Sequence, residues 1–187
     1  MKEKEKTNIS KFISKILRHR PEIIGINLDE HGWADVEELI QGVRRAGHPA
    51  FDRAMLDEIV ETNNKKRYSL SDDGRLIRAN QGHSIPVDVE LPKMTPPDIL
   101  WHGTGECFLP SIQEQGILHM NRLYVHLSLD EATAVQVGRR HGKPALLRVD
   151  AKRMDEEGFD FYYAVNGVWL TKTVPVGFFQ RVPAEGV

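Results

Sequence analysis

The chain has 187 residues, of which 40% are hydrophobic and 28% charged, and this predicts an ordinary soluble globular protein with one large domain or two small ones. Its net charge of −2 argues against a protein that binds polyanions with its whole surface. The single cysteine excludes an internal disulfide and indicates a reducing, cytoplasmic location, while the spacing of the eight histidines predicts no metal site. There is no apolar run of about 18 residues, so we expect no membrane span.

The N-terminal segment is basic on one side. Its first helix is predicted to begin near Asn8 or Ser10 and to end before Pro21. Between residues 6 and 20 there are five cations and no acid: Lys6, Lys11, Lys15, Arg18 and Arg20. A second cluster occupies residues 65–67, with the sequence KKR. Local basic clusters on a nearly neutral protein favour a specific anionic ligand, although a solvated helix face would have the same pattern.

Together with the first helix, the rest of this half predicts three helices followed by a β-hairpin. The expected elements are a short strand at 26–28, helices at 36–43 and 56–60, and hairpin strands at 67–70 and 76–79. Asp52 is the expected N-cap of the third helix, and the second helix, whose apolar positions span 36–43, is expected to end at Gly47. This order is that of a winged helix, a module that binds nucleic acid or other proteins.

Four prolines in residues 85–98 indicate a linker, so we predict one lobe over residues 1–84 and another over residues 99–187. The second lobe opens with a strand at 99–101, which we expect to break at a glycine turn, residues 102–105, where the backbone could approach a ligand. A helix ending at Gly116 and a strand at 122–128 follow. That strand would place Tyr124, His126 and Ser128 on one face.

The remaining pattern of the second lobe is mostly β. A helix is predicted at 130–140 and strands at 145–149 and 177–182, and Asn166-Gly167 is a strong signal for a hairpin. The whole chain is therefore predicted to be α+β.

Several kinds of chemistry have no motif in this sequence. It contains no P-loop, no dinucleotide-binding G-x-G-x-x-G after a strand and no G-x-S-x-G nucleophile elbow. Arginine, histidine and glycine remain, and arginine forks suit phosphate because they bind its oxygens and neutralise charge that develops on them. The residues alone predict only a protein that binds a phosphorylated ligand.

Six motifs in a fixed order carry a resemblance to a known family. They are SKILRH (14–19), KKRY (65–68), IRANQGHS (77–84), HGT (102–104), VHLS (125–128, preceded by Arg122) and NGVWLT (166–171). Together they resemble the RNA 2′-phosphotransferase family, NAD-dependent enzymes that remove an internal 2′-phosphate from RNA. The resemblance extends from about Lys11 to Val182, and the combination of IRANQGHS with HGT and VHLS is its most specific part.

The resemblance implies a fold and a site. The fold is an N-terminal winged-helix lobe followed by a C-terminal lobe with a mixed β, ADP-ribosyltransferase-like fold, which meet over NAD. The family's Arg-His-Arg-Arg catalytic set falls on Arg18, His19, Arg67 and Arg122. The family's NAD-binding positions fall on His102, Gly103, Thr104, His126 and Ser128, and on Val168, where many ADP-ribosyltransferases have a glutamate.

The implied partners are NAD, as co-substrate, and RNA bearing a 2′-phosphate, which is the splice-junction phosphate in organisms that splice tRNA. No metal and no membrane are implied, and we expect a monomer. Two alternatives remain open: an ADP-ribosyltransferase that caps phosphorylated nucleic-acid ends, and a winged-helix protein that only senses NAD or ADP-ribose. Protein ADP-ribosylation is disfavoured, because Val168 lacks the carboxylate that would activate a neutral acceptor.

Overall fold

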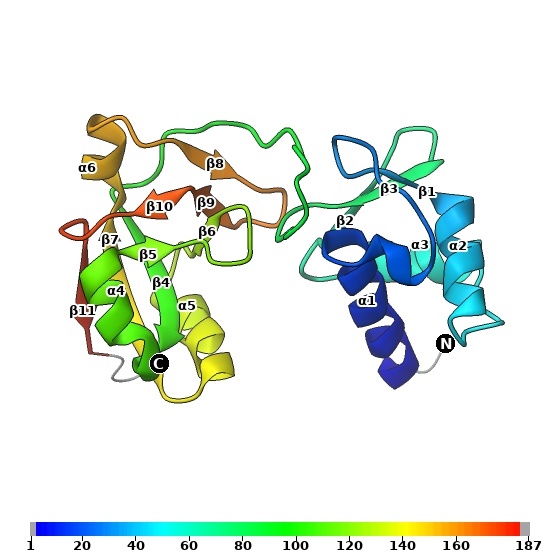
Figure 1. The fold of residues 1–187 in the computed structure, drawn as a ribbon, viewed down its shortest axis with the longest axis horizontal. Coiled ribbons are helices and arrows are strands. Elements are labelled where there is room, and N and C mark those ends of the chain that lie inside the picture. Colours follow the sequence, from blue (N-terminus) through cyan, green and yellow to red (C-terminus); the bar gives the residue numbers. More distant parts are fainter. Residues whose placement is uncertain (1–2, 184–187) are drawn as a thin grey trace. The chain divides into compact units, whose positions relative to one another are not determined.

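The computed structural model describes residues 3–183 and divides into two compact units, Met1–Glu90 and Leu91–Val187 (Figure 1). Each unit combines helices with small antiparallel sheets, which confirms the predicted α+β class. The division lies inside the predicted linker, residues 85–98. The assignment of a function to each lobe stays a prediction. No helix within residues 3–183 is long and apolar enough to cross a membrane.

Over residues 3–90, the N-terminal unit contains three helices and one three-stranded sheet. The helices and the 3-10 turn are α1 (Glu3–Arg18), η1 (Pro21–Ile23), α2 (Val36–Arg45) and α3 (Arg53–Glu61). The strands are β1 (Ala34–Asp35), β2 (Tyr68–Leu70) and β3 (Leu76–Ala79), paired antiparallel in the order β1-β3-β2. The predicted N-cap is confirmed, since the Asp52 carboxylate accepts a 2.8 Å hydrogen bond from the backbone N–H of Met55.

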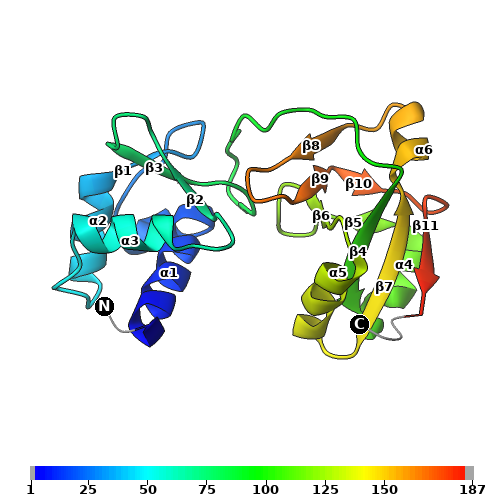
Figure 2. The ribbon, with the colours of Figure 1, turned by 180° about the vertical axis from the view of Figure 1, so that it is seen from behind.

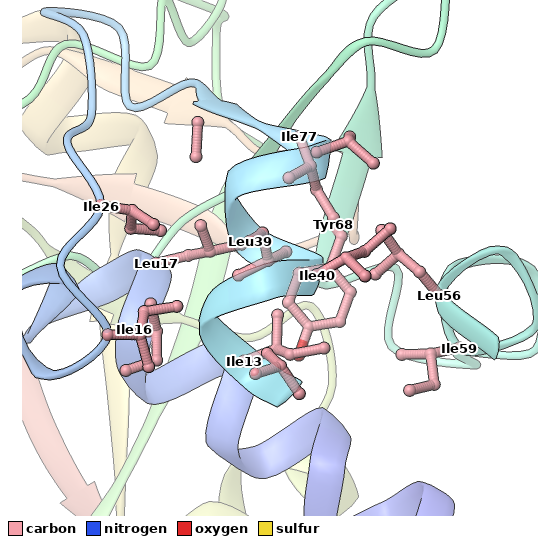
Figure 3. Close-up of a cluster of buried hydrophobic side chains, with 14 of the residues drawn as sticks. Ile13, Ile16, Leu17, Ile26, Leu39, Ile40, Leu56, Ile59, Tyr68 and Ile77 are labelled. Atoms are coloured by element: carbon pink, nitrogen blue, oxygen red, sulfur yellow. The ribbon is translucent and has the colours of Figure 1, made fainter. Parts of the chain in front are cut away.

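The core of this unit is built from residues spaced three or four apart along its helices (Figure 3). Ile13, Ile16 and Leu17 of α1 pack with apolar side chains of α2, α3 and the sheet, and all three are fully buried. This spacing puts them on one helix face, so the basic residues that alternate with them lie toward solvent.

Two predictions for this unit are wrong. The first helix begins at Glu3 rather than near Asn8, because the ammonium of Lys6 bridges Glu3 at 3.1 Å and Glu58 at 3.2 Å and ties the early turns to α3. The predicted strand at 26–28 is not formed. There the backbone N–H of Ile26 donates instead to the carbonyl of Pro21, at 3.3 Å, and the Ile26 side chain is buried in the core of this unit.

In its described part, residues 91–183, the C-terminal unit contains two three-stranded sheets and one strand pair, with short helices. The first sheet, in the order β11-β7-β4, is made of β4 (Ile99–Gly105), β7 (Pro144–Asp150) and β11 (Phe179–Val182). The second, in the order β6-β9-β8, is made of β6 (Val125–Leu127), β8 (Phe161–Tyr163) and β9 (Trp169–Thr171). The pair is β5 (Ile117–Leu118) with β10 (Thr173–Val174).

The helical elements of this unit are α4 (Leu109–Gln115), α5 (Glu131–Gly138), α6 (Ala151–Glu156) and the 3-10 turns η2 (Glu106–Phe108) and η3 (Arg139–His141). Figure 2 shows α5 beside β4 and β7, against which it packs. Trp101 and Ser128 join the two larger sheets by a reciprocal pair of backbone hydrogen bonds of 2.9 and 2.7 Å. As a result, the end of β6 lies beside the middle of β4.

The predicted glycine turn at 102–105 is wrong. β4 runs without interruption through Gly105, because its whole length pairs with β7. The glycine there serves helix packing instead: a Cβ added to Gly103 would lie 1.6 Å from the carbonyl oxygen of Ala134 in α5. The strand predicted at 122–128 is also shorter than expected, since only residues 125–127 form it. The predicted helix end at Gly116 is confirmed by its left-handed φ of +83°.

Candidate active site

In the N-terminal unit, Arg18 and His19 are at the end of α1 and are held by the segment that follows β3. The His19 imidazole Nδ1 lies 2.9 Å from the hydroxyl of Ser84, and the backbone N–H of Ser84 donates to the carbonyl of Arg18 at 3.0 Å. A Cβ on Gly82 would be 3.6 Å from the Arg18 guanidinium carbon. Residues 82–84 therefore confine both predicted catalytic side chains.

Arg67 comes directly before β2, and the next residue, Tyr68, links this segment to α1. The phenolic oxygen of Tyr68 lies 2.6 Å from the Ser14 hydroxyl and donates to the Ser10 carbonyl at 2.5 Å. Both serines belong to α1, which ends at Arg18. The structure thus brings together the two segments that carry Arg18 with His19 and Arg67.

His83 is the buried centre of this region, with 1% of its surface exposed. Burial, assisted by the positive charge of Arg18 and by His19 and Arg78, lowers the pKa of His83 to about 4. His83 is therefore neutral at pH 7. The sequence alone leaves open whether His83 takes part in phosphate chemistry or only packs the hairpin against the linker, because no local pattern reports its burial.

Acidification is expected to destabilise the protein through His83. The folded-state pKa of about 4 is below the ordinary value of 6.5, so the unfolded chain binds the proton first. The stabilisation is present above pH 6.5 and is lost as the pH falls toward 4, by about 3 kcal/mol in the free energy of unfolding.

Urea titrations across this range should show a clearly weaker pH dependence of the free energy of unfolding for His83→Gln than for the wild type. The exposed His119 provides the control, since His119→Gln should follow the wild type. Identical curves for wild type and His83→Gln would mean that the folded protein accepts a charge on His83.

In the C-terminal unit, two histidines are held in defined tautomers. The Nδ1 of His102 lies 3.0 Å from the backbone carbonyl of His126, which can only accept, so this nitrogen carries the proton. Burial lowers the pKa of His102, and His141 acts in the same direction, against the opposing effect of that hydrogen bond. His102 is therefore neutral, and its Nε2 is a hydrogen-bond acceptor.

Arg122 and His126 form the second defined contact. An Nη1 of Arg122 lies 2.7 Å from the Nδ1 of His126. Because a guanidinium only donates, Nδ1 accepts and the His126 proton is on Nε2. The pKa of Arg122 is lowered by partial burial and by the nearby charge of Arg140, which indicates a locally cationic surface at this point of the unit.

The other predicted NAD-binding positions differ in their surroundings. Ser128 is at the junction of the two sheets, beside β4, and Val168 is in the β8–β9 turn, where its carbonyl accepts from the N–H of Ala164 at 3.0 Å. Thr104 is buried in β4, and Gly103 contacts α5. His102, His126 and Ser128 are thus gathered at one place, whereas the structure gives Gly103 a packing role; whether any of these residues bind NAD stays a prediction. Within residues 3–183, no cluster of three histidines, cysteines or carboxylates could hold a metal ion.

The comparisons with known proteins agree with one another. The family model described as "RNA 2'-phosphotransferase, Tpt1 / KptA family" matches residues 4–173. The chain is 52% identical over 179 residues to "RNA 2'-phosphotransferase" of Escherichia coli K12, covering 95% of this chain and 97% of that protein. It is 51% identical over 174 residues to "Probable RNA 2'-phosphotransferase" of Acaryochloris marina, covering 93% and 96%.

These likenesses extend over both units and over all six motifs, so the protein is a transferase of the class that acts on RNA phosphate. The chain belongs to the RNA 2′-phosphotransferase, Tpt1 / KptA family. The resemblance drawn from the sequence motifs is confirmed.

Proposed function

We propose that this protein removes an internal 2′-phosphate from RNA with NAD as co-substrate. The reaction passes through ADP-ribosylated RNA and gives 2′-hydroxyl RNA, ADP-ribose 1″,2″-cyclic phosphate and nicotinamide. The observation that carries the proposal is the 52% identity, over 95% of the chain, to a protein named RNA 2′-phosphotransferase.

The N-terminal unit is proposed to be the winged-helix lobe that binds RNA. Its element order, α1-β1-α2-α3-β2-β3, and its sheet order, β1-β3-β2, support this assignment. Four lysines are exposed and are proposed to contact the RNA backbone, two on α1 and two before β2: Lys11, Lys15, Lys65 and Lys66. The C-terminal unit is proposed to be the ADP-ribosyltransferase-like lobe, in which β4 and β6 carry the NAD-binding residues.

NAD would supply an electrophilic ribose carbon and nicotinamide as leaving group. His102 suits such a ligand, because its neutral Nε2 can accept a hydrogen bond from a ribose hydroxyl. The backbone of Ser128 is hydrogen-bonded to that of Trp101, the residue before His102. Ser128 therefore offers a hydroxyl at the junction of the two sheets, close to His102. Binding at this place would leave Gly103 to its packing role.

The first step needs no general base from the protein. The 2′-phosphate is already anionic at neutral pH, since its second pKa is about 6, and one of its oxygens bonds to ribose C1″ as nicotinamide departs. A carboxylate beside the incoming phosphate would repel it. Val168, at the position where many ADP-ribosyltransferases have glutamate, is consistent with this difference.

The second step places more demand on the cations. The ribose 2″-hydroxyl attacks phosphorus and loses its proton, and the bond from phosphorus to the RNA 2′-oxygen breaks as that oxygen gains a proton. Negative charge grows on the phosphoryl oxygens, and we assign their stabilisation to Arg18, Arg67 and Arg122. His19, with its Nδ1 at the Ser84 hydroxyl, would use Nε2 as an acid or as a further donor to phosphate.

The test is incubation of the protein with NAD and a short RNA that carries one internal 2′-phosphate, followed by analysis of RNA and nucleotide products. The expected result is NAD-dependent loss of the phosphate with appearance of ADP-ribose cyclic phosphate. ADP-ribosylated RNA that never resolves would instead support a capping enzyme. Absence of nicotinamide release would overturn the proposal and leave an NAD-sensing protein.

A further inference from the structure

Asn80 makes contacts that nothing in the proposed chemistry requires. It follows β3 directly and is 5% exposed. From these contacts we infer that Asn80 is a positioning residue that fixes Arg67 for its contact with the substrate phosphate. The inference rests on the proposed function, because it presumes that Arg67 binds this phosphate.

The contacts of Asn80 surround Arg67 on both sides in the sequence. Its side-chain Nδ2 donates to the carbonyl of Lys66 at 2.7 Å, and its Oδ1 accepts from the hydroxyl of Ser69 at 2.6 Å. Its backbone N–H donates to the carbonyl of Arg67 itself, at 2.9 Å. Three bonds from one residue therefore define the path of the chain through residues 66–69.

The path needs this support because it is strained. Lys66 has a φ of +39°, a left-handed conformation that costs a residue with a side chain roughly 1–2 kcal/mol. The backbone N–H of Lys66 donates to the carbonyl of Asn63 at 2.8 Å, and the carbonyl of Lys66 accepts from the Asn80 amide. Without the Asn80 amide, Lys66 could relax to a commoner conformation and carry Arg67 away.

The side chain of Arg67 is held less firmly than its backbone. Its Nη1 lies 3.4 Å from the Oδ1 of Asn63, a long contact. The backbone therefore decides where the guanidinium can reach. A displacement of about 1 Å at a positioned group can reduce a rate on the order of 10²-fold, so the loss of a buried amide remote from the substrate could impair phosphate transfer.

A double-mutant cycle between Asn80 and Arg67 tests the inference. We expect Asn80→Ala to weaken binding of the 2′-phosphorylated RNA, measured without NAD, and to slow the second step by about 10- to 100-fold. If Asn80 acts through Arg67, Asn80→Ala should have little further effect in Arg67→Ala protein. The KM for NAD should stay unchanged.

Ser71 provides the matched control in the same hairpin. Its hydroxyl donates to Asp73 at 2.7 Å and accepts from the N–H of Leu76 at 2.9 Å, yet these bonds are away from Arg67. Ser71→Ala should reduce the free energy of unfolding without changing RNA binding. Additive effects of Asn80→Ala and Arg67→Ala, or equal rates for Asn80→Ala and Ser71→Ala, would overturn the inference.

A second variant and a binding measurement without turnover keep the test decisive. If Asn80→Ala does not fold, Asn80→Asp keeps the shape and the bond from Ser69 but removes the donor to Lys66, and the same cycle applies. Binding is measured without turnover, so a wild-type protein that binds the RNA but releases no nicotinamide would disprove the proposed function and leave the cycle intact.

Discussion

Arg122→Ala protein is expected to ADP-ribosylate the RNA and then stall. Removing one donor to a developing oxyanion typically reduces the rate about 10²–10³-fold, and we expect this loss in the second step, where charge grows on the phosphate. The contact of Arg122 with the Nδ1 of His126 holds its guanidinium in one orientation, so neither water nor a flexible substitute reproduces it. Single-turnover reactions quenched at increasing times should show ADP-ribosylated RNA accumulating.

Two variants qualify this result. Arg122→Lys keeps the charge but loses the planar fork, so it should resolve the intermediate at a rate between those of wild type and alanine. Arg140→Ala removes a nearby exposed cation that has no assigned role, and it should turn over almost normally. Equal slowing of both steps by Arg122→Ala would contradict a specific role in the second.

The larger elements could be predicted because their patterns are local. The helices α1, α2 and α3 have apolar residues at helical spacing, and the cap of α3 is an aspartate. The paired strands β5 and β10 had no such signal, since two residues cannot show a period. The helix α6 has only six residues, which is also too short for a clear helical pattern. The uninterrupted course of β4 through its glycines depends on pairing with β7, about forty residues later in the chain.

The candidate site also has a part that could be predicted from the sequence and a part that could not. Arg18, His19, Arg67 and Arg122 were singled out through the family resemblance, whose Arg-His-Arg-Arg set falls on them, whereas residue types alone predicted only a protein that binds a phosphorylated ligand. Supporting residues such as Asn80 and Ser84 were not recognised individually, although both belong to the IRANQGHS motif. Their roles depend on contacts with segments 11 to 65 residues away in the sequence, which no local pattern reports.

Gly103→Ala is expected to be one of the most destabilising single substitutions in the C-terminal unit. The new Cβ would lie 1.6 Å from the carbonyl oxygen and 2.4 Å from the carbonyl carbon of Ala134, both backbone atoms that cannot rotate away. Helix α5 would have to shift, and with it the buried contacts of Ala134 and Val135 with Leu146. Overpacking usually costs about 1–3 kcal/mol, and a rigid backbone contact should reach or exceed the upper end. Urea unfolding of this variant should give that loss.

The same variant separates the packing role of Gly103 from the ligand approach suggested by the sequence. Gly158→Ala is the control, because its Cβ would meet nothing within 4 Å and its φ of +92° leaves only backbone strain, about 1–2 kcal/mol. If Gly103 serves packing, Gly103→Ala should lose clearly more stability than Gly158→Ala, and the protein that remains folded should bind NAD nearly normally. A variant of ordinary stability with a KM for NAD raised tenfold would instead assign Gly103 to the ligand, since a backbone that approaches NAD closely has no room for a methyl group.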